Sequence, residues 1–215
     1  MVSDDGEEEE QLGWLKDCES EVLSRDVVLL RGMPLPLQKQ LCQALRSCPP
    51  FFSSRNEKTH RVDMLHLGLH EGRDGFRMVV SIPPLYTQLA KAAHAHVADR
   101  HGMLRSVPLI ESDVAVVNAY KRDAKLGMHV DRRSARHCGI PVVAISLGES
   151  AEFVFKNSWR ARAQPNHVML RSGDVLVFGG KARGIVHGIE RLVPGSAPYG
   201  VCLDHKLLCS ESHTE

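Results

Sequence analysis

The chain has 215 residues, a formal net charge of +1, and 43% hydrophobic residues. This length fits one domain with an extension, and the composition is sufficient for a hydrophobic core. No apolar run approaches the roughly eighteen residues of a membrane-spanning helix. The acidic start, MVSDDGEEEE, is the opposite of a signal or transit peptide, so we expect a cytoplasmic or nuclear location.

The small net charge hides an asymmetry along the chain. Residues 1–26 contain ten acidic and two basic residues, a balance of −8, which leaves +9 on the remainder. A basic body behind an acidic segment favours a polyanionic partner such as a nucleic acid. A solvated surface beside a disordered tail is the alternative interpretation.

The cysteines argue against a zinc knuckle, because they are scattered and form no Cys-x-x-Cys pair. In a reducing compartment we expect them to be free thiols. The six are Cys18, Cys42, Cys48, Cys138, Cys202 and Cys209.

The first half of the chain predicts a lead, strands and two helices. We expect residues 1–25 to form an acidic, disordered lead. The apolar run at 26–33 predicts a buried strand, and leucines at helical spacing after it predict a helix that ends at Cys-Pro-Pro. The alternating segment at 61–69 predicts another strand. A second helix is expected to begin at Pro83 and Pro84.

From about residue 110 the pattern changes to short strands that are separated by turns. The segments SDVAVVNAY, PVVAISLG, SAEFVF, NHVMLRSGDVLVFGG, GIVHGI and PYGVCL follow one another in this way. Such spacing is typical of a barrel or a double-sheet jelly roll. We therefore expect an α+β fold, with a jelly-roll (double-stranded β-helix) core and N-terminal helices packed on one face.

A candidate metal site lies in the segment GMHVD. His129 and Asp131 are two residues apart, and on a strand such residues point to the same face. His187, near a strand end in GIVHGIE, is the best candidate for a third ligand. Two imidazoles and one carboxylate form the facial triad of non-haem Fe(II) oxygenases. Satisfied or exposed polar residues are the alternative, since the chain has twelve histidines.

Four segments resemble, in order, the core of the AlkB family, the 2-oxoglutarate- and Fe(II)-dependent dealkylases of nucleic acids. They are NAYKRDAKLGMHVD, IPVVAISLGESAEFVF, SGDVLVFGGKARGIVHGI and GSAPYGV. The likeness extends from about residue 26 to 201. It implies a single dioxygenase domain over 26–215, with a C-terminal tail at 202–215 that departs from the family.

The resemblance implies that the cofactors are Fe(II), 2-oxoglutarate as cosubstrate, and O2. His129, Asp131 and His187 would bind the iron. Asn118 and Tyr120, in the segment NAY, would hydrogen-bond 2-oxoglutarate, and an amide and a phenol are suitable donors to a carboxylate. A strand-end cap and a core aromatic are the alternatives for this pair. Arg183, on the loop before His187, could reach a cosubstrate or a phosphate, but a lone arginine on a loop is expected to be solvated.

The implied activity is oxidative demethylation of N-alkylated bases in DNA or RNA, which must be single-stranded or flipped out. A basic group around the site could contact the nucleic acid, or could be a solvated loop. Its members are Lys121, Arg122, Arg132 and Arg133. In some family members a carboxylate at the position of Arg133 faces the substrate base. An arginine there would repel a cationic methylated base, which weakens the assignment of such a base as the substrate. The sequence leaves open DNA against RNA, the methylated base and the oligomeric state.

The C-terminus departs from the family, whose last strand has the form Arg-x-Asn-x-Thr-x-Arg and binds 2-oxoglutarate through its arginines. Here no arginine follows Arg191. The chain could be truncated or alternatively spliced, Lys206 or another arginine could substitute, or catalysis could be lost. Lysine lacks the forked guanidinium. We expect impaired cosubstrate binding and an exposed sheet edge. A non-catalytic binding protein, an oxygenase with another substrate, and a cupin remain rival interpretations.

Overall fold

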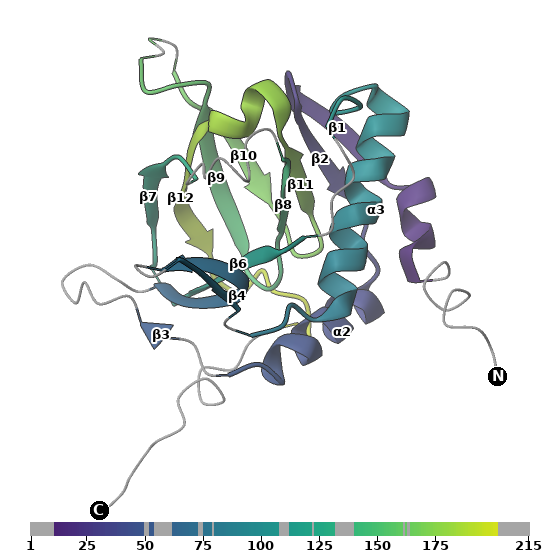
Figure 1. Cartoon of the computed structure of the whole chain (residues 1–215), viewed down its shortest axis with the longest axis vertical. Helices are drawn as coiled ribbons and strands as arrows, with labels where there is room; N and C mark the ends of the chain where they lie inside the picture. The colour runs from purple at the N-terminus through teal and green to yellow at the C-terminus, as the bar shows by residue number, and fades with distance from the viewer. Residues whose placement is uncertain are drawn as a thin grey trace, which may run out of the picture.

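The protein is described by a computed structural model, which is drawn in Figure 1. The described residues are 11–49, 52–53, 62–72, 75–78, 80–107, 112–121, 123–131, 140–160, 162 and 164–201. Within them, antiparallel sheets pack beside two longer helices. This arrangement confirms the predicted α+β class and jelly-roll core. None of the helices in this part of the chain is both long and apolar enough to cross a bilayer.

One sheet joins the start of the chain to the second half. Its strand order is β1-β2-β11-β8. Val177 of β11 stands opposite Val28 of β2 on one side and Val143 of β8 on the other. The strands are β1 (Glu19–Ser24), β2 (Val27–Arg31), β8 (Val142–Ile145) and β11 (Val175–Phe178).

A second sheet carries the candidate ligand histidines. Its order is β10-β9-β12-β7, so that strands far apart in the sequence lie side by side. The hairpin of β9 and β10 forms one edge, and β7 forms the other. The strands are β7 (Leu126–His129), β9 (Ser150–Lys156), β10 (Asn166–Leu170) and β12 (Val186–Val193).

A third group of strands completes the sheets. β4 pairs with β3, β5 and β6, and the pairing with β6 covers the longest register. The strands are β3 (Phe52–Ser53), β4 (Val62–Gly72), β5 (Gly75–Met78) and β6 (Val114–Tyr120). The helical segments are η1 (Gly13–Lys16), α2 (Leu35–Arg46), α3 (Pro84–His101) and η3 (Gly180–Gly184).

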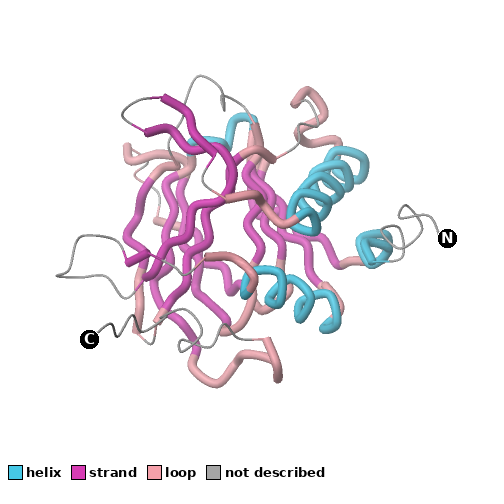
Figure 2. The backbone as a smooth tube through the Cα atoms, turned by 60° about the horizontal axis from the view of Figure 1, so that its bottom comes forward, coloured by secondary structure: helices cyan, strands magenta, loops and turns pink. Residues whose placement is uncertain are grey.

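The core has two layers because successive residues of a strand point to opposite faces. Val28 and Val177 pack in a buried cluster with apolar residues of α2 and α3. Val27 and Phe178 pack in a second cluster that includes Phe155 of β9, between the two sheets. The helices therefore cover one side of the sheets, as expected from the sequence, and Figure 2 shows them gathered there.

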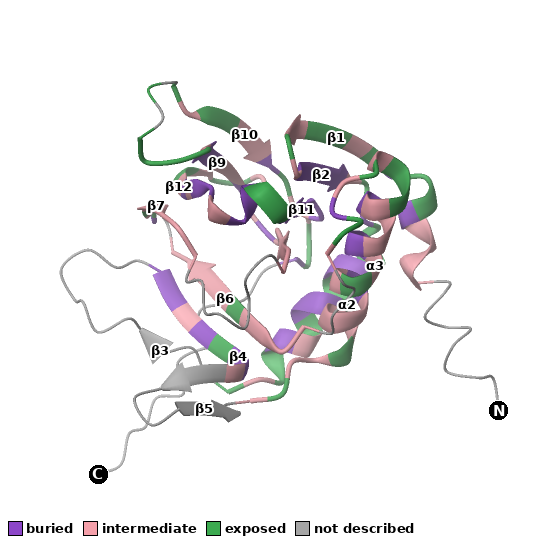
Figure 3. Cartoon of the chain, turned by 45° about the horizontal axis from the view of Figure 1, so that its top comes forward, coloured by how far each residue is buried: buried purple, intermediate pink, exposed green. Residues whose placement is uncertain are grey.

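The helix α3 begins where the sequence predicts. Pro83 and Pro84 open α3, because proline at the first turn lacks only an N–H that has no helical partner. Gly102 closes the helix in the left-handed conformation, with φ of +65°. The residues Leu89, Ala93 and Val97 lie at helical spacing and are fully buried, and Figure 3 shows the buried stripe along the helix.

The predicted disordered lead is wrong for the residues from Gln11 onward. Gly13–Lys16 form a 3-10 helix, and Glu19–Ser24 form β1, which pairs with β2. The acidic composition suggested disorder, but Leu15 and Cys18 are buried in the cluster that includes α3. Burial of these apolar side chains offsets the entropy of ordering the segment.

Several strands lie at sheet edges in the part of the chain that is described, and β8 and β6 are two of them. There β8 pairs only with β11, and β6 pairs only with β4. All four residues of β8 are apolar but only half-buried, whereas the four residues of β11 are buried. The predicted tail at 202–215 lies outside the described residues.

Candidate metal centre

The candidate ligands come from the adjoining ends of two paired strands. His129 is the last residue of β7, His187 is the second residue of β12, and the two stand directly opposite each other. Asp131 lies two residues beyond the end of β7. The expectation that His129 and Asp131 share one strand face is therefore wrong, because the chain leaves the sheet at residue 130. The loop nevertheless returns the carboxylate to the two imidazoles.

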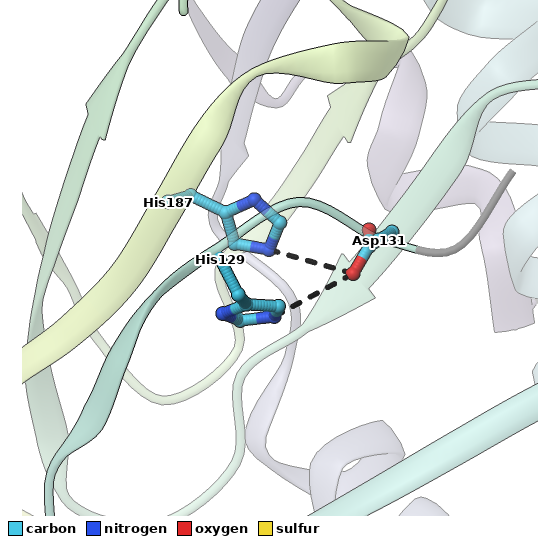
Figure 4. Close-up of side chains that lie close together, drawn as sticks. All are labelled: His129, Asp131 and His187. Carbon is cyan, nitrogen blue, oxygen red and sulfur yellow. Dashed lines mark ion pairs between the residues drawn. The ribbon is translucent and has the colours of Figure 1, made fainter. Parts of the chain in front are cut away.

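The three side chains converge on one point, as Figure 4 shows. Asp131 Oδ1 lies 3.6 Å from His129 Nε2 and 3.7 Å from His187 Nε2. One ligand atom from each residue lies within 4.8 Å of the others. Two imidazole nitrogens and a carboxylate oxygen at such separations can bind a single ion. The structure therefore brings together all three predicted ligands.

Backbone carbonyls orient both imidazoles. His129 Nδ1 lies 2.9 Å from the Gly127 carbonyl, and His187 Nδ1 lies 3.4 Å from the Ile185 carbonyl. A carbonyl can only accept, so in each neutral ring Nδ1 carries the hydrogen and donates it. The lone pair is then on Nε2, the nitrogen that faces Asp131. This arrangement is typical of histidines that bind metals.

Burial and charge set the protonation of the three groups. The nearby carboxylate of Asp131 raises the pKa of His129 above its usual value. Burial lowers the pKa of His187. Burial alone would raise the pKa of Asp131, but the nearby His129, His187 and Arg183 outweigh it and lower that pKa. An ionised carboxylate next to a neutral His187 is the state that a divalent cation requires.

The sequence did not indicate that Arg183 is buried beside Asp131. It was expected on a solvated loop, but only 8% of its surface is exposed. Its Nη1 lies 3.8 Å from Asp131 Oδ2, the carboxylate oxygen that is not nearest to the imidazoles. Ala182 and Ile185 beside it are buried as well, and this apolar setting was the available signal that the loop packs inward.

Aromatic rings cover His187 on the side of the core. Its ring centroid lies 5.6 Å from that of Phe153 and 5.4 Å from that of Phe178. Both phenylalanines belong to the buried cluster between the sheets. The candidate site therefore has an apolar wall on one side, which lowers the local dielectric and strengthens electrostatic interactions within it.

The predicted cosubstrate residues, Asn118 and Tyr120, lie on β6. They stand opposite Met64 and Val62 of β4 and, two residues apart, face the same side of the strand. Burial raises the pKa of Tyr120 to about 12, so its phenol stays protonated at neutral pH and can donate. Asn118 Oδ1 is buried and has no hydrogen-bond partner among the described residues. Both features are compatible with a polar ligand, and the assignment stays a prediction.

The predicted nucleic-acid contacts are only partly described. Lys121 precedes β7, at the opposite end of that strand from His129. Its Nζ lies 3.0 Å from the carboxylate of Asp63, which is buried. The other three residues of the basic group, Arg122, Arg132 and Arg133, lie outside the described residues.

Comparison with known proteins identifies the class. A family model described as the 2OG-Fe(II) oxygenase superfamily matches residues 6–207, and the chain belongs to this superfamily. Its members are defined by Fe(II) and 2-oxoglutarate, and the triad of this chain has the donor set that suits Fe(II).

Within that superfamily the chain is of the AlkB type. It is 35% identical over 134 residues to the DNA N(6)-methyladenine demethylase ALKBH1D of Arabidopsis thaliana, which covers 60% of this chain and 30% of that protein. It is 33% identical over 96 residues to the nucleic acid dioxygenase ALKBH1 of Homo sapiens, 45% of this chain and 24% of the relative. The solved structure of OsALKBH1 matches with a TM-score of 0.69 and 30% identity, over 83% of this chain and 91% of that one. The chain thus spans less than a third of the length of these curated relatives.

Proposed function

We propose that the chain is an Fe(II)- and 2-oxoglutarate-dependent oxidative demethylase of N-alkylated bases in DNA or RNA. The observation that carries the proposal is the convergence of His129, Asp131 and His187 in a member of the 2OG-Fe(II) oxygenase superfamily. Relatives named as a DNA N(6)-methyladenine demethylase and as a nucleic acid dioxygenase support the substrate class.

The triad would hold the metal through His129 Nε2, His187 Nε2 and Asp131 Oδ1. Iron, when bound, supplies the activation of O2 that is coupled to oxidation of 2-oxoglutarate. The carbonyls of Gly127 and Ile185 keep both rings in the tautomer that can ligate.

The surrounding residues would orient the cosubstrate and restrict the access of water to the metal site. Phe153 and Phe178 exclude water from the inner side of His187. Tyr120, which keeps its proton because of burial, would donate to a carboxylate of 2-oxoglutarate, and the Asn118 amide would contribute a second hydrogen bond.

A specific observation favours a second candidate function. In the given sequence no arginine follows Arg191, whereas the resemblance implies two arginines on the family's last strand. Loss of a charge-assisted pair to a buried carboxylate typically costs about 2–5 kcal/mol. We therefore expect weakened 2-oxoglutarate binding, and the alternative function is a non-catalytic, AlkB-like nucleic-acid-binding protein. An oxygenase that acts on a substrate other than nucleic acid is the third candidate.

The test separates these candidates in steps. Calorimetry with Fe(II) under anaerobic conditions measures metal binding, and titration of 2-oxoglutarate into the loaded protein measures cosubstrate affinity. Oxygen is then admitted, and succinate is measured with and without methylated single-stranded oligonucleotides. Succinate that rises with the oligonucleotide supports the demethylase. Metal binding with oligonucleotide binding but no succinate supports the non-catalytic protein, and succinate without any salt-dependent oligonucleotide binding supports the third candidate.

A further inference from the structure

The connection between β9 and β10 presents an unusual surface. Trp159 is 59% exposed there, although tryptophan is normally among the more buried residues. The ammonium of Lys156 lies 5.9 Å from the centroid of the Trp159 ring. Arg160 and Arg162 on the same connection are exposed as well. An exposed indole with three basic residues near it in the sequence is typical of a surface that binds a ligand.

Strand register places this connection beside the candidate metal centre. One row of opposed residues crosses the four strands of this sheet. In the order β7, β12, β9 and β10 its members are His129, His187, Phe155 and Asn166. Neighbouring strands are about 4.8 Å apart, so Asn166, where β10 begins, is about 10 Å from His187.

Strand direction places the connection at the same end of the sheet as the metal centre. β7 and β9 run toward the end of the sheet at which β12 and β10 begin. Asp131, η3 and the β9–β10 connection therefore all emerge at that end, and Figure 1 shows the connection and η3 there together.

A second exposed aromatic residue offers a comparison within the same molecule. Tyr199 is 94% exposed, and Lys39 Nζ lies 5.8 Å from its ring centroid. Tyr199 follows β12, at the opposite end of that strand from His187. Among the described residues, two exposed aromatic rings pair with a lysine, and of these two pairs the one with Trp159 adjoins the candidate metal centre.

We propose that Lys156, Trp159, Arg160 and Arg162 form a binding surface for single-stranded nucleic acid next to the metal centre. The indole stacks on an unpaired base that neighbours the base held at the metal, and the cations contact the phosphates on either side. Stacking on an aromatic side chain accepts any base, and cations that follow the backbone supply salt-dependent affinity. This inference rests on the proposed function, because it names the surface that holds the polymer while one base reaches the metal.

The test measures binding rather than turnover. A fluorescein-labelled oligo-deoxyadenylate of about 12 nucleotides is titrated with the full chain, and anisotropy gives the dissociation constant at several salt concentrations. Trp159→Ala is expected to weaken binding on the order of tenfold, and Trp159→Phe to keep most of the affinity because a ring remains. The double variant Arg160→Gln with Arg162→Gln is expected to lower the salt slope by about one to two. Tyr199→Ala is the matched control and should leave the dissociation constant unchanged.

A second readout follows the indole directly. Oligonucleotide binding should quench the tryptophan emission of the wild-type chain and of Trp14→Phe, which keeps only Trp159 of the two tryptophans. Emission of Trp159→Phe should not respond. Since Trp159 is exposed, its substitution is not expected to change the melting temperature. An unchanged melting temperature of the variant would show that its loss of affinity does not come from unfolding.

The outcomes separate this surface from the proposed function. If Trp159→Ala and Tyr199→Ala both bind as tightly as the wild type, the surface is refuted while a nucleic-acid demethylase stands. If Trp159→Ala binds poorly and no succinate forms under any condition, the surface is supported and catalysis is refuted. If the wild-type chain binds no oligonucleotide even at low salt, both are overturned, and a protein partner becomes the better explanation of the exposed indole.

Discussion

Gly188 allows β7 to approach β12 closely, and its replacement tests whether this approach assembles the metal centre. A Cβ at position 188 would lie 2.5 Å from the Leu126 carbonyl oxygen and 3.1 Å from backbone atoms of Gly127 and Met128. Carbon contacts are favourable at about 3.5 Å or more, so Gly188→Ala must push β7 away by about 1 Å. His129 is on β7 and moves with it, whereas His187 is the neighbour of the substituted residue.

The expected cost follows from this overlap. Overpacking against backbone that cannot rotate away costs about 1–3 kcal/mol. For a chain of this size each kcal/mol lowers the melting temperature by about 2–4 °C, so a decrease of roughly 2–12 °C is expected. Displaced supporting groups weaken metal binding by roughly 10–100-fold, and we expect an effect of this size for Gly188→Ala.

The assay compares Gly188→Ala with Gly127→Ala in thermal melts and in calorimetric titration with Fe(II) or Co(II). Gly127 is in the facing strand, and a Cβ there has no atom within 4 Å, which makes it the matched control. The control should keep its metal affinity and melt within about 1 °C of the wild type. Wild-type metal affinity in Gly188→Ala would refute the view that the close approach of β7 and β12 sets the geometry of the site.

Three further predictions concern single groups. Asp131→Asn removes the anionic ligand. Residues that only support a metal ligand typically change metal affinity by roughly 10–100-fold, and we expect a larger decrease for Asp131→Asn in calorimetry. Unchanged affinity would show that Asp131 does not bind the metal. Burial lowers the pKa of His94, so its contribution to stability is present above about pH 6.5 and is lost as pH falls through the folded pKa. His94→Leu should therefore show a smaller fall in melting temperature between pH 7.5 and 5.5, and an equal fall would contradict this. Arg31→Met leaves the buried Asp174 carboxylate without its ion pair and should cost about 3–5 kcal/mol in urea unfolding, whereas a cost below about 1 kcal/mol would show that the pair is dispensable.

Local rules were sufficient for most of the secondary structure. The prolines that open α3 act through backbone geometry alone, so the start of this helix could be predicted from the sequence. The strands after residue 110 were recognised from apolar runs between turns. The segment Glu19–Ser24 was missed because its order depends on pairing with β2 and on the contacts of Leu15 and Cys18 with distant residues. Composition carries no information about such partners.

The metal centre shows the same division between local pattern and tertiary contact. The spacing of His129 and Asp131 predicted two side chains that the structure places close together, although Asp131 lies beyond the strand and not on it. Pairing of β7 with β12 brings His187 to the site. The sequence suggested His187 through its place near a strand end and through the resemblance of several core segments, but it did not predict this pairing. The burial of Arg183 and the placement of Trp159 depend on which loops share one end of a sheet, which no short motif encodes.

The edge of β8 that faces away from β11 can be tested for a covering strand. Val143 and Ile145 pack against the cluster that includes the helices, and Val142 and Ala144 pack against the cluster between the sheets. Both faces of the strand are therefore covered, so the partial exposure of all four residues must come from the edge opposite β11. In an antiparallel pair only every second residue exchanges hydrogen bonds with a given neighbour. If no strand covers this edge, hydrogen exchange of the β8 amides should alternate between slow and fast, and the chain should self-associate as its concentration rises, because such an edge can pair with another copy. Uniformly slow exchange at micromolar concentration, with a constant monomeric mass in light scattering, would show instead that the chain supplies its own covering strand.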